Sequence, residues 1–435
     1  MDKKEIVTKI LEINKYEKLN PMQEIAKEHI GKKTLITTPT ASGKTTVFEM
    51  YMLDCLLNKK KKVIYISPLK ALTNEHYQET KRKFSKELNI KVAISTGDLD
   101  SNSKFLENYD VLFLTYEKFD SILRREPFWI KEVGLLTIDE IHELGSNRGA
   151  TLEVLLTQIK HNFKDIILLG LSATIKNSKE IADWLSAELV LSNYRPVPLE
   201  TGVFYNDKIY FENREENLET KAYKNLNLGS IIKDTLDKNK QAIVFCTSRK
   251  NASSFSKKYG NIIKDFVSEK EYLKLREISQ EVLNTLESPT TQCQELSHSL
   301  LLGASFHHAG LVYKQRELIE DNFKKGIIKI IFATPTLAAG INLPAYRVII
   351  NNIYRFNEGK MTPIKVNEFM QMAGRAGRPK YDKSGQAIAV SLKENDVSKI
   401  YETYINGKPE DIESQLSKFI ILRMHLLTMI LINQK

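Results

Sequence analysis

The chain has 435 residues, 42% of them hydrophobic, and a formal net charge of +10. This length predicts roughly three domains with packed cores and excludes a disordered or fibrous protein. Its three cysteines are widely spaced and odd in number, which argues against a disulfide framework or a zinc site and fits a reducing cytoplasm.

The positive charge is compatible with binding to a polyanion, and a solvated lysine-rich surface explains it equally well. No apolar stretch follows Met1, so we expect no secretory signal. The longest apolar run, 420–432, contains Arg423 and His425 and is too short to cross a bilayer. We therefore expect a cytoplasmic protein with no membrane partner.

Short runs of β-branched and aliphatic residues alternate with amphipathic stretches through the first half of the chain. This is typical of buried parallel strands between helices. Polar residues follow each run directly, where an open α/β sheet binds its ligands. The runs lie at 63–66, 111–114, 135–138 and 166–169.

The same pattern returns in the second half and predicts a second α/β domain. Two prolines within 193–198 interrupt regular structure, so we place the linker near 193–200 and the domains at 1–195 and 196–395. The polar residues between Asn206 and Asn227 predict loop and helix. The predicted strands of this half lie at 242–245, 328–332, 347–350 and 386–390.

After Ser391 the pattern becomes helical, and residues 412–432 place apolar side chains on a broad face. Such a face must be covered. We therefore predict that residues 396–435 begin a third, helical or winged-helix domain that is incomplete in this chain.

Residues 38–45 read TPTASGKT and lie between a predicted strand at 34–37 and a stretch with helical spacing at 45–57. This context predicts a phosphate-binding loop whose backbone N–H groups surround phosphates. Thr38 stands where the first glycine of such a motif is expected, so a chance match is the alternative. The predicted nucleotide-binding residues are Thr40, Ala41, Ser42, Gly43, Lys44 and Thr45, with Lys44 on the phosphates and Thr45 on Mg²⁺.

Asp139 and Glu140 end an otherwise apolar strand, and a buried strand rarely carries paired carboxylates at its tip without a ligand to meet. We predict that Asp139 binds Mg²⁺ and that Glu140 polarises the attacking water. A helix N-cap followed by a first-turn Glu is the alternative. We interpret His142 as a coupling residue rather than a metal ligand, because no partner ligands stand at suitable spacing.

Residues 371–378 read QMAGRAGR, so two arginines stand three residues apart in a frame of glycines. Arg375 and Arg378 are suited to phosphate oxygens whose charge grows during phosphoryl transfer, and we predict that they act when the two domains close. Surface ion pairing is the alternative. Together with the phosphate loop and the paired carboxylates, this segment predicts a nucleotide-driven motor.

The ordered motifs resemble those of superfamily 2 helicases over about 20–380. Within that superfamily, the strings HHAGL, TLAAGINLP and MAGRAGRP resemble the superkiller-like group, and most closely the archaeal Hjm-type DNA repair helicases. The matching segments are 19–23, 38–45, 67–75, 96–98, 139–142, 172–174, 244–250, 306–311, 333–344 and 371–379.

The resemblance implies two RecA-like domains with ATP and Mg²⁺ in the cleft and a single strand across both, translocated 3′ to 5′. Gln23 would then contact adenine, Gln371 would sense the γ-phosphate, and Gly340 and Asn342 would approach the nucleotide. Ser172 and Thr174 would couple the γ-phosphate to strand binding. The strand-contacting residues that the resemblance implies are Pro68, Lys70, Thr115, Arg249 and Thr334.

In this group a β-hairpin separates the duplex. Here 348–354 and 362–366 would flank a turn at 357–360, placing a hairpin at about 350–366 with Arg355 and Phe356 near its tip. Family members continue through further domains. We therefore expect a separately encoded C-terminal subunit to dock on 412–432.

We therefore predict that the protein is an ATP-dependent 3′–5′ DNA helicase that acts on single-stranded or forked, repair-associated DNA. An RNA helicase of the same group is the nearest alternative, because backbone contacts do not distinguish the two sugars. A nucleotide-gated scaffold that binds strands without unwinding them is the alternative from another class.

Overall fold

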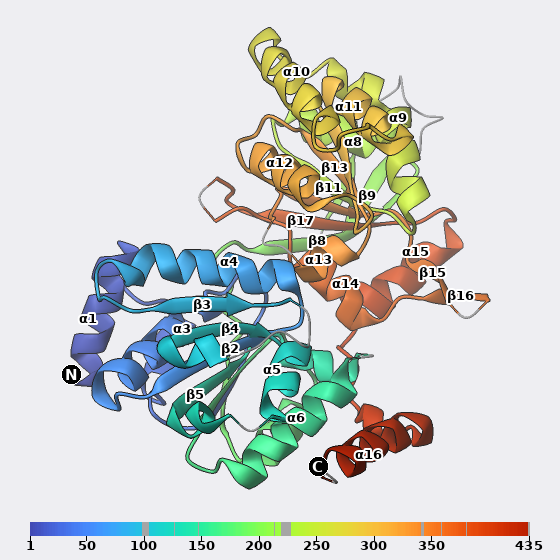
Figure 1. The fold of residues 1–435 in the computed structure, drawn as a ribbon. Helices are drawn as coiled ribbons and strands as arrows, with labels where there is room; N and C mark the ends of the chain where they lie inside the picture. The colour runs from blue at the N-terminus through green and yellow to red at the C-terminus, as the bar shows by residue number, and fades with distance from the viewer. Residues whose placement is uncertain are drawn as a thin grey trace. The chain divides into compact units, whose positions relative to one another are not determined.

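The computed structural model describes residues 1–97, 104–125, 127–146, 148–212, 214–218, 228–340, 343–357, 359–379 and 381–433. The chain folds into two compact units (Figure 1). The first unit combines Met1–Arg195 with Glu410–Lys435, and the second is Pro196–Pro409. No helix among the described residues is both long and apolar enough to cross a membrane.

The first unit is built on a parallel sheet with the strand order β3-β4-β2-β5-β6-β1-β7. Successive side chains of a strand point to opposite faces, so Leu35 packs in the core on one side of the sheet and Ile36 in the core on the other. Because both faces are buried, the strands are apolar along nearly their whole length.

The strands of this unit are β1 (Thr34–Thr37), β2 (Lys62–Ser67), β3 (Val92–Ser95), β4 (Val111–Thr115), β5 (Val133–Ile138), β6 (Ile167–Ser172) and β7 (Glu188–Leu191). Its α-helices are α1 (Lys3–Asn14), α2 (Pro21–Lys27), α3 (Lys44–Leu53), α4 (Lys70–Thr80), α5 (Tyr116–Leu123), α6 (Gly149–Asn162), α7 (Ser178–Leu185) and α16 (Phe419–Asn433).

The second unit contains a sheet with the order β10-β9-β8-β17-β14-β11-β13-β12. The neighbouring strands in the series β8-β17-β14-β11-β13-β12 pair in parallel. Strand β9 pairs antiparallel with both β8 and β10. Its strands are β8 (Leu199–Tyr205), β9 (Lys208–Phe211), β10 (Glu215–Asn217), β11 (Ala242–Phe245), β12 (Ala304–His307), β13 (Ile330–Ala333), β14 (Arg347–Ile350), β15 (Tyr354–Asn357), β16 (Lys360–Pro363) and β17 (Gly385–Val390). Its helices are α8 (Gly229–Asp237), α9 (Arg249–Lys264), α10 (Glu269–Leu283), α11 (Thr291–Leu301), α12 (Tyr313–Lys324), α13 (Thr336–Gly340), α14 (Val366–Ala373) and α15 (Asn395–Ile400).

The prediction of loop and helix between Asn206 and Asn227 is wrong for the described part of that segment, which forms β9 and β10. Ile209 and Phe211 alternate with more exposed neighbours and pack into the core of the second unit. This period of two was hidden because the strand is only four residues long. Residues 219–227 lie outside the described part of the chain.

A separate two-stranded hairpin is formed by β15 and β16, with Phe356 opposite Met361. Its strands cover 354–357 and 360–363, whereas the sequence predicted flanks at 348–354 and 362–366. Residues 348–350 belong to β14 instead, because their side chains are buried on both faces of the large sheet between β11 and β17.

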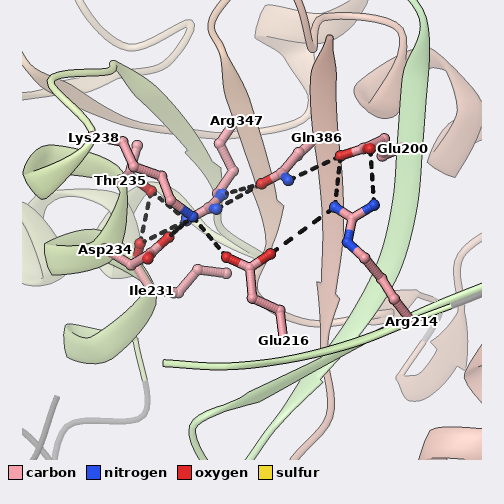
Figure 2. A network of polar contacts seen from close by, with 9 residues as sticks. All are labelled: Glu200, Arg214, Glu216, Ile231, Asp234, Thr235, Lys238, Arg347 and Gln386. Carbon is pink, nitrogen blue, oxygen red and sulfur yellow. Dashed lines mark hydrogen bonds and ion pairs between the residues drawn. The ribbon is translucent and has the colours of Figure 1, made fainter. Parts of the chain in front are cut away.

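A closed ring of polar contacts joins α8, β8, β10, β14 and β17 (Figure 2). Arg347, which is fully buried, donates to Gln386, Asp234, Thr235 and the carbonyl of Ile231. The ring is completed by Lys238, Glu216, Arg214 and Glu200. It lies toward the amino ends of the parallel strands, since Arg347 begins β14 and Gln386 is the second residue of β17.

The C-terminal segment of the first unit has a packed part and an exposed part. The side chain of Ile412 packs on the core, and its main chain bonds to Asn177 through both N–H and C=O. Helix α16 lies next to α6 (Figure 1). Its side chains at Phe419, Ile420 and Leu427 are nevertheless more than half exposed.

Candidate functional site

The phosphate loop connects β1 to α3 and has a strained backbone. Gly43 is the N-cap of α3 and has φ +88°, and Ala41 has φ +63°. The positive φ favours glycine at position 43, and a Cβ there would lie 2.6 Å from Nε2 of Gln23 and displace that amide.

Helix α2 holds this loop from one side. Nδ2 of Asn20 donates to the carbonyl of Ser42 at 2.9 Å, and Nε2 of Gln23 donates to the carbonyl of Gly43 at 3.0 Å. Oε1 of Gln23 accepts from the backbone N–H of Asn20 in a capping box. Gln23 therefore shapes the phosphate loop, and its contact with adenine stays a prediction.

Asp139 and Glu140 follow β5, the strand between β2 and β6. The Asp139 side chain is 8% exposed, and its Oδ1 accepts from the backbone N–H of Glu140 at 2.9 Å. Glu140 adopts a left-handed backbone conformation with φ +51°, which is uncommon for a residue with a Cβ and is frequent at active sites.

Burial would raise the pKa of the Asp139 carboxyl, but the nearby His76 ring, the Tyr65 hydroxyl and the Lys44 charge hold it below its usual value. The group is therefore an anion at neutral pH. A buried carboxylate of this kind is a suitable oxygen ligand for Mg²⁺.

His142 lies between the paired carboxylates and the end of β6. Its Nδ1 is 3.4 Å from Oε2 of Glu140 and accepts from the backbone N–H of Ala173, also at 3.4 Å. Ser172 is fully buried, and its carbonyl accepts from the N–H of Thr38 in the phosphate loop. The structure thus brings His142, Ser172 and the loop together within the first unit.

Six of the twelve buried polar atoms without hydrogen-bond partners among the described residues lie at this edge of the sheet. These six come from the ends of β1, β5 and β6 and from the phosphate loop. Because buried polar groups are normally paired, such a cluster fits a polar ligand. The atoms are Oγ1 of Thr37, Thr38 and Thr137, Oγ of Ser42 and Ser172, and Oε2 of Glu140. Together with the loop and the Asp139 carboxylate, these residues fit a nucleoside triphosphate with Mg²⁺.

The predicted strand-binding residues of the first unit lie at the ends of neighbouring strands. Lys70 begins α4 and is exposed, whereas Pro68 is buried and its carbonyl accepts from Arg148. The hydroxyl of Thr115 caps α5 by accepting from the N–H of Lys118 at 3.3 Å. Of these three side chains, that of Lys70 is the most available to a strand.

Four predicted strand-binding residues of the second unit line one cavity of about 350 Å³. Its apolar lining includes Phe245, Ile350 and Met372, and its polar lining includes threonine hydroxyls. An apolar lining with a few polar groups is typical of a ligand pocket. The four residues are Arg249, Thr334, Arg355 and Phe356.

Arg355 is paired with Glu368 at 2.8 Å, and Phe356 is 72% exposed on the hairpin. Arg249 lies close to His308, whose buried ring stacks on Phe306 with centroids 5.5 Å apart. Burial and the Arg249 charge lower the pKa of His308.

The two predicted arginine fingers differ in their surroundings within the second unit. Nε of Arg375 donates to the carbonyl of Ala338 at 2.9 Å. Arg378 is bound to Asp382 through its backbone N–H, Nε and Nη2, at 3.0, 2.9 and 3.2 Å. Lys240 also bonds to Asp382, whose side chain is fully buried. Arg378 therefore has a structural ion pair here, and its catalytic role stays a prediction.

Gln371 lies on α14 and Gly340 ends α13, both in the second unit. Asn342 lies outside the described residues. Thr45 follows Lys44 in the first turn of α3, and Thr174 follows β6 by two residues. Their roles on nucleotide, metal and coupling stay predictions.

Comparison with known proteins identifies two domains. Residues 20–181 match the DEAD/DEAH box helicase family, and residues 270–380 match the helicase conserved C-terminal domain. The chain therefore resembles superfamily 2 helicases over both of these domains. The predicted fold class, two parallel-sheet RecA-like domains flanked by helices, is confirmed.

The chain is also similar to archaeal relatives named ATP-dependent DNA helicase Hel308, which confirms the predicted Hjm-type resemblance. It is 43% identical to the Pyrococcus horikoshii protein over 401 residues, or 92% of this chain and 54% of the relative. The Pyrococcus abyssi protein is 44% identical over 405 residues, covering 92% and 54%, and the Methanococcus vannielii protein is 40% identical over 424 residues, covering 94% and 56%. The chain spans about half the length of these relatives.

Sequence reasoning missed Asn20, His76 and Asp382, which contact the predicted site residues. For Asn20 a signal existed, because Asn20 and Gln23 stand at capping-box spacing before a helix. His76 had none, because it meets Asp139 through tertiary packing. Asp382 stands only four residues after Arg378, and the turn that joins the two was not recognised.

Proposed function

We propose that the chain is an ATP- and Mg²⁺-dependent DNA helicase motor whose hydrolysis is stimulated by nucleic acid. The observation that carries this proposal is the convergence, at one edge of the first sheet, of the phosphate loop, the paired carboxylates and the unpartnered buried polar atoms. The Hel308 relatives support DNA as the substrate.

The nucleotide supplies the phosphoryl group whose transfer to water releases free energy, and Mg²⁺ neutralises charge on its phosphates. Lys44 and the loop N–H groups bind the phosphates, while Asp139 and Thr45 hold the metal ion. Glu140 orients water, with its left-handed backbone fixing where the carboxylate points. His142 links Glu140 to the end of β6 and so to strand binding.

On the strand-binding side, we propose that Lys70 of the first unit and the cavity around Arg249 and Thr334 in the second unit contact the strand backbone. The hairpin would separate base pairs, since Phe356 at 72% exposure offers an aromatic face for a terminal base pair. We further propose 3′–5′ translocation and a preference for forked DNA, by resemblance to the family.

The experiment is ATP turnover measured by phosphate release with single-stranded DNA, single-stranded RNA and a forked DNA duplex of matched sequence. We expect strong stimulation by the DNA strands, and Lys44→Ala should abolish turnover while strand binding persists. Retained turnover in Lys44→Ala would remove the phosphate-loop assignment. Equal or greater stimulation by RNA would favour the RNA helicase, and strand binding without turnover would favour the scaffold.

We also propose that the exposed face of α16 is covered by further polypeptide, supplied as a separately encoded subunit. The supporting observation is that Ile420, Met424 and Leu427 are 75%, 64% and 59% exposed on one helix. Because Ile412 packs against the core, the docking face is narrower than 412–432 and consists of α16.

The double substitution Ile420→Glu and Leu427→Glu tests this docking face. We expect the wild-type chain to self-associate in sedimentation velocity through the exposed face, and the charged variant to stay monomeric. A wild-type chain that is monomeric at every concentration, and that unwinds forked DNA as fast as the variant does, would contradict the proposal.

A further inference from the structure

Helix α4 carries a histidine that reaches the proposed metal-binding carboxylate. Nε2 of His76 lies 3.5 Å from Oδ2 of Asp139, and the His76 side chain is 13% exposed. The His76 ring packs against the buried Tyr65 ring of β2, with centroids 5.0 Å apart. His76 lies outside the predicted nucleotide-binding residues.

The sheet explains why His76 reaches Asp139. Strands β2 and β5 are neighbours, and the N–H of Asp139 donates to the carbonyl of Ile66 at 2.9 Å. Directly after Ile66, the hydroxyl of Ser67 pairs with that of Thr73 at 2.6 Å, which fixes α4 to the end of β2. His76 lies three residues beyond Thr73, nearly one helical turn, and so on the same side of α4.

The Asp139 carboxylate is held at both of its oxygens. Oδ1 accepts from the N–H of Glu140, while Oδ2 faces the His76 ring. The hydroxyl of Tyr116 donates to the main-chain carbonyl of Asp139 and so fixes the backbone as well. Nδ1 of His76 is buried with no hydrogen-bond partner among the described residues, so Nε2 is the nitrogen that contacts a partner.

We propose that His76 is a positioning residue that orients the Asp139 carboxylate for Mg²⁺ binding. The inference rests on the proposed function, since it assigns a support to the same site. Nε2–H of His76 donates to Oδ2 and restrains the rotation of the carboxylate, whose remaining lone pairs would be available to the metal ion. Groups that orient metal ligands in this way typically affect metal affinity or activity by about 10–100-fold.

The test measures equilibrium binding of a fluorescent N-methylanthraniloyl derivative of ADP while Mg²⁺ is titrated from an EDTA-buffered start. We expect His76→Ala to raise the Mg²⁺ concentration for half-maximal binding by roughly 10-fold. Binding without Mg²⁺ should stay at the wild-type level. His76→Gln should restore much of the loss, because its amide nitrogen can donate to Oδ2 as Nε2 does.

Two controls separate the possible failures. Gln78→Ala alters an exposed position of the same helix and should bind as the wild type does. Lys44→Ala should lose nucleotide binding with or without Mg²⁺, and if it does not, the proposed function itself fails. If Lys44→Ala loses binding while His76→Ala keeps the wild-type Mg²⁺ requirement, the role of His76 alone is refuted.

A general loss of folding is detected by tryptophan fluorescence, since Trp129 and Trp184 both lie in the first unit. A merely structural role predicts that His76→Ala lowers the unfolding temperature with an unchanged Mg²⁺ midpoint, and this outcome also overturns the proposal.

Discussion

Replacing Arg347 by Met removes the guanidinium from the centre of the polar ring in Figure 2 while keeping an apolar stem of similar length. In the wild type, this fully buried group donates five hydrogen bonds at 2.6 to 3.2 Å. The substitution leaves the Gln386 carbonyl and the Thr235 hydroxyl without their donor. We expect the second unit to lose stability while the first unit keeps it.

The magnitude follows from what remains after the substitution. Breaking a buried ion pair by removing one partner costs about 3–5 kcal/mol, mostly because the other charge is stranded. Here Asp234 keeps a second cation, Lys238 at 2.9 Å, and is 17% exposed. We therefore expect Arg347→Met to lower the free energy of unfolding of the second unit by about 3 kcal/mol, the lower end of that range. Arg214→Met, in the same ring but at a side chain that is 49% exposed, should cost less than about 1 kcal/mol.

The assay is guanidinium denaturation followed with two probes. Far-UV circular dichroism reports both units, whereas tryptophan fluorescence reports the first unit alone, because Trp129 and Trp184 lie there. We expect Arg347→Met to move the circular dichroism transition to lower denaturant and to leave the fluorescence transition in place. If Arg347→Met and Arg214→Met cost the same within about 0.5 kcal/mol, the ring does not depend on its buried member and this reasoning is refuted.

Two further predictions concern glycine and histidine positions. Gly43→Ala should weaken binding of the fluorescent nucleotide, and it should lower the free energy of unfolding by more than Gly326→Ala does. Both positions have positive φ, but only at Gly43 would the new Cβ lie 2.6 Å from Gln23. Equal effects of the two substitutions in urea denaturation would contradict this prediction. Burial lowers the pKa of His308 below its usual 6.5, and its Nδ1 accepts from the N–H of Gly310, so the folded chain resists protonation there. Below pH 6.5 the unfolded chain binds this proton and the folded chain does not, so stability should fall as pH falls. His308→Asn should flatten that decline between about pH 7.5 and pH 5.5 in thermal unfolding, and an unchanged slope would show that other groups cause it.

The central strands of both sheets were predictable because they are buried on both faces and therefore apolar throughout. The runs at 111–114 and 242–245, for example, coincide with β4 and β11. The edge strands and β9 were not predicted. Strand β3 forms one edge and has two partly exposed residues among four, and β9 is too short to show its period.

The site was predictable where chemistry follows a strand directly in sequence, as with Lys44 after β1 and Asp139 after β5. Contacts made through packing were not. His76 reaches Asp139 only through the packing of α4 on the sheet, and the αL backbone of Glu140 leaves no mark on residue type. Propensity and motif spacing describe neighbours along the chain, and these features depend on neighbours in space.

The first unit is discontinuous, since Ile412, from beyond the whole of Pro196–Pro409, packs against its core. During synthesis, the sheet of β1 to β7 emerges long before the segment that fills this last position. The second unit is thus inserted into the sequence of the first unit. All of its residues are synthesised before the last segment of the first unit. Because chains fold roughly from the N-terminus as they are made, the contacts of Ile412 with Asn177 and Gly145 form only after the second unit has been synthesised.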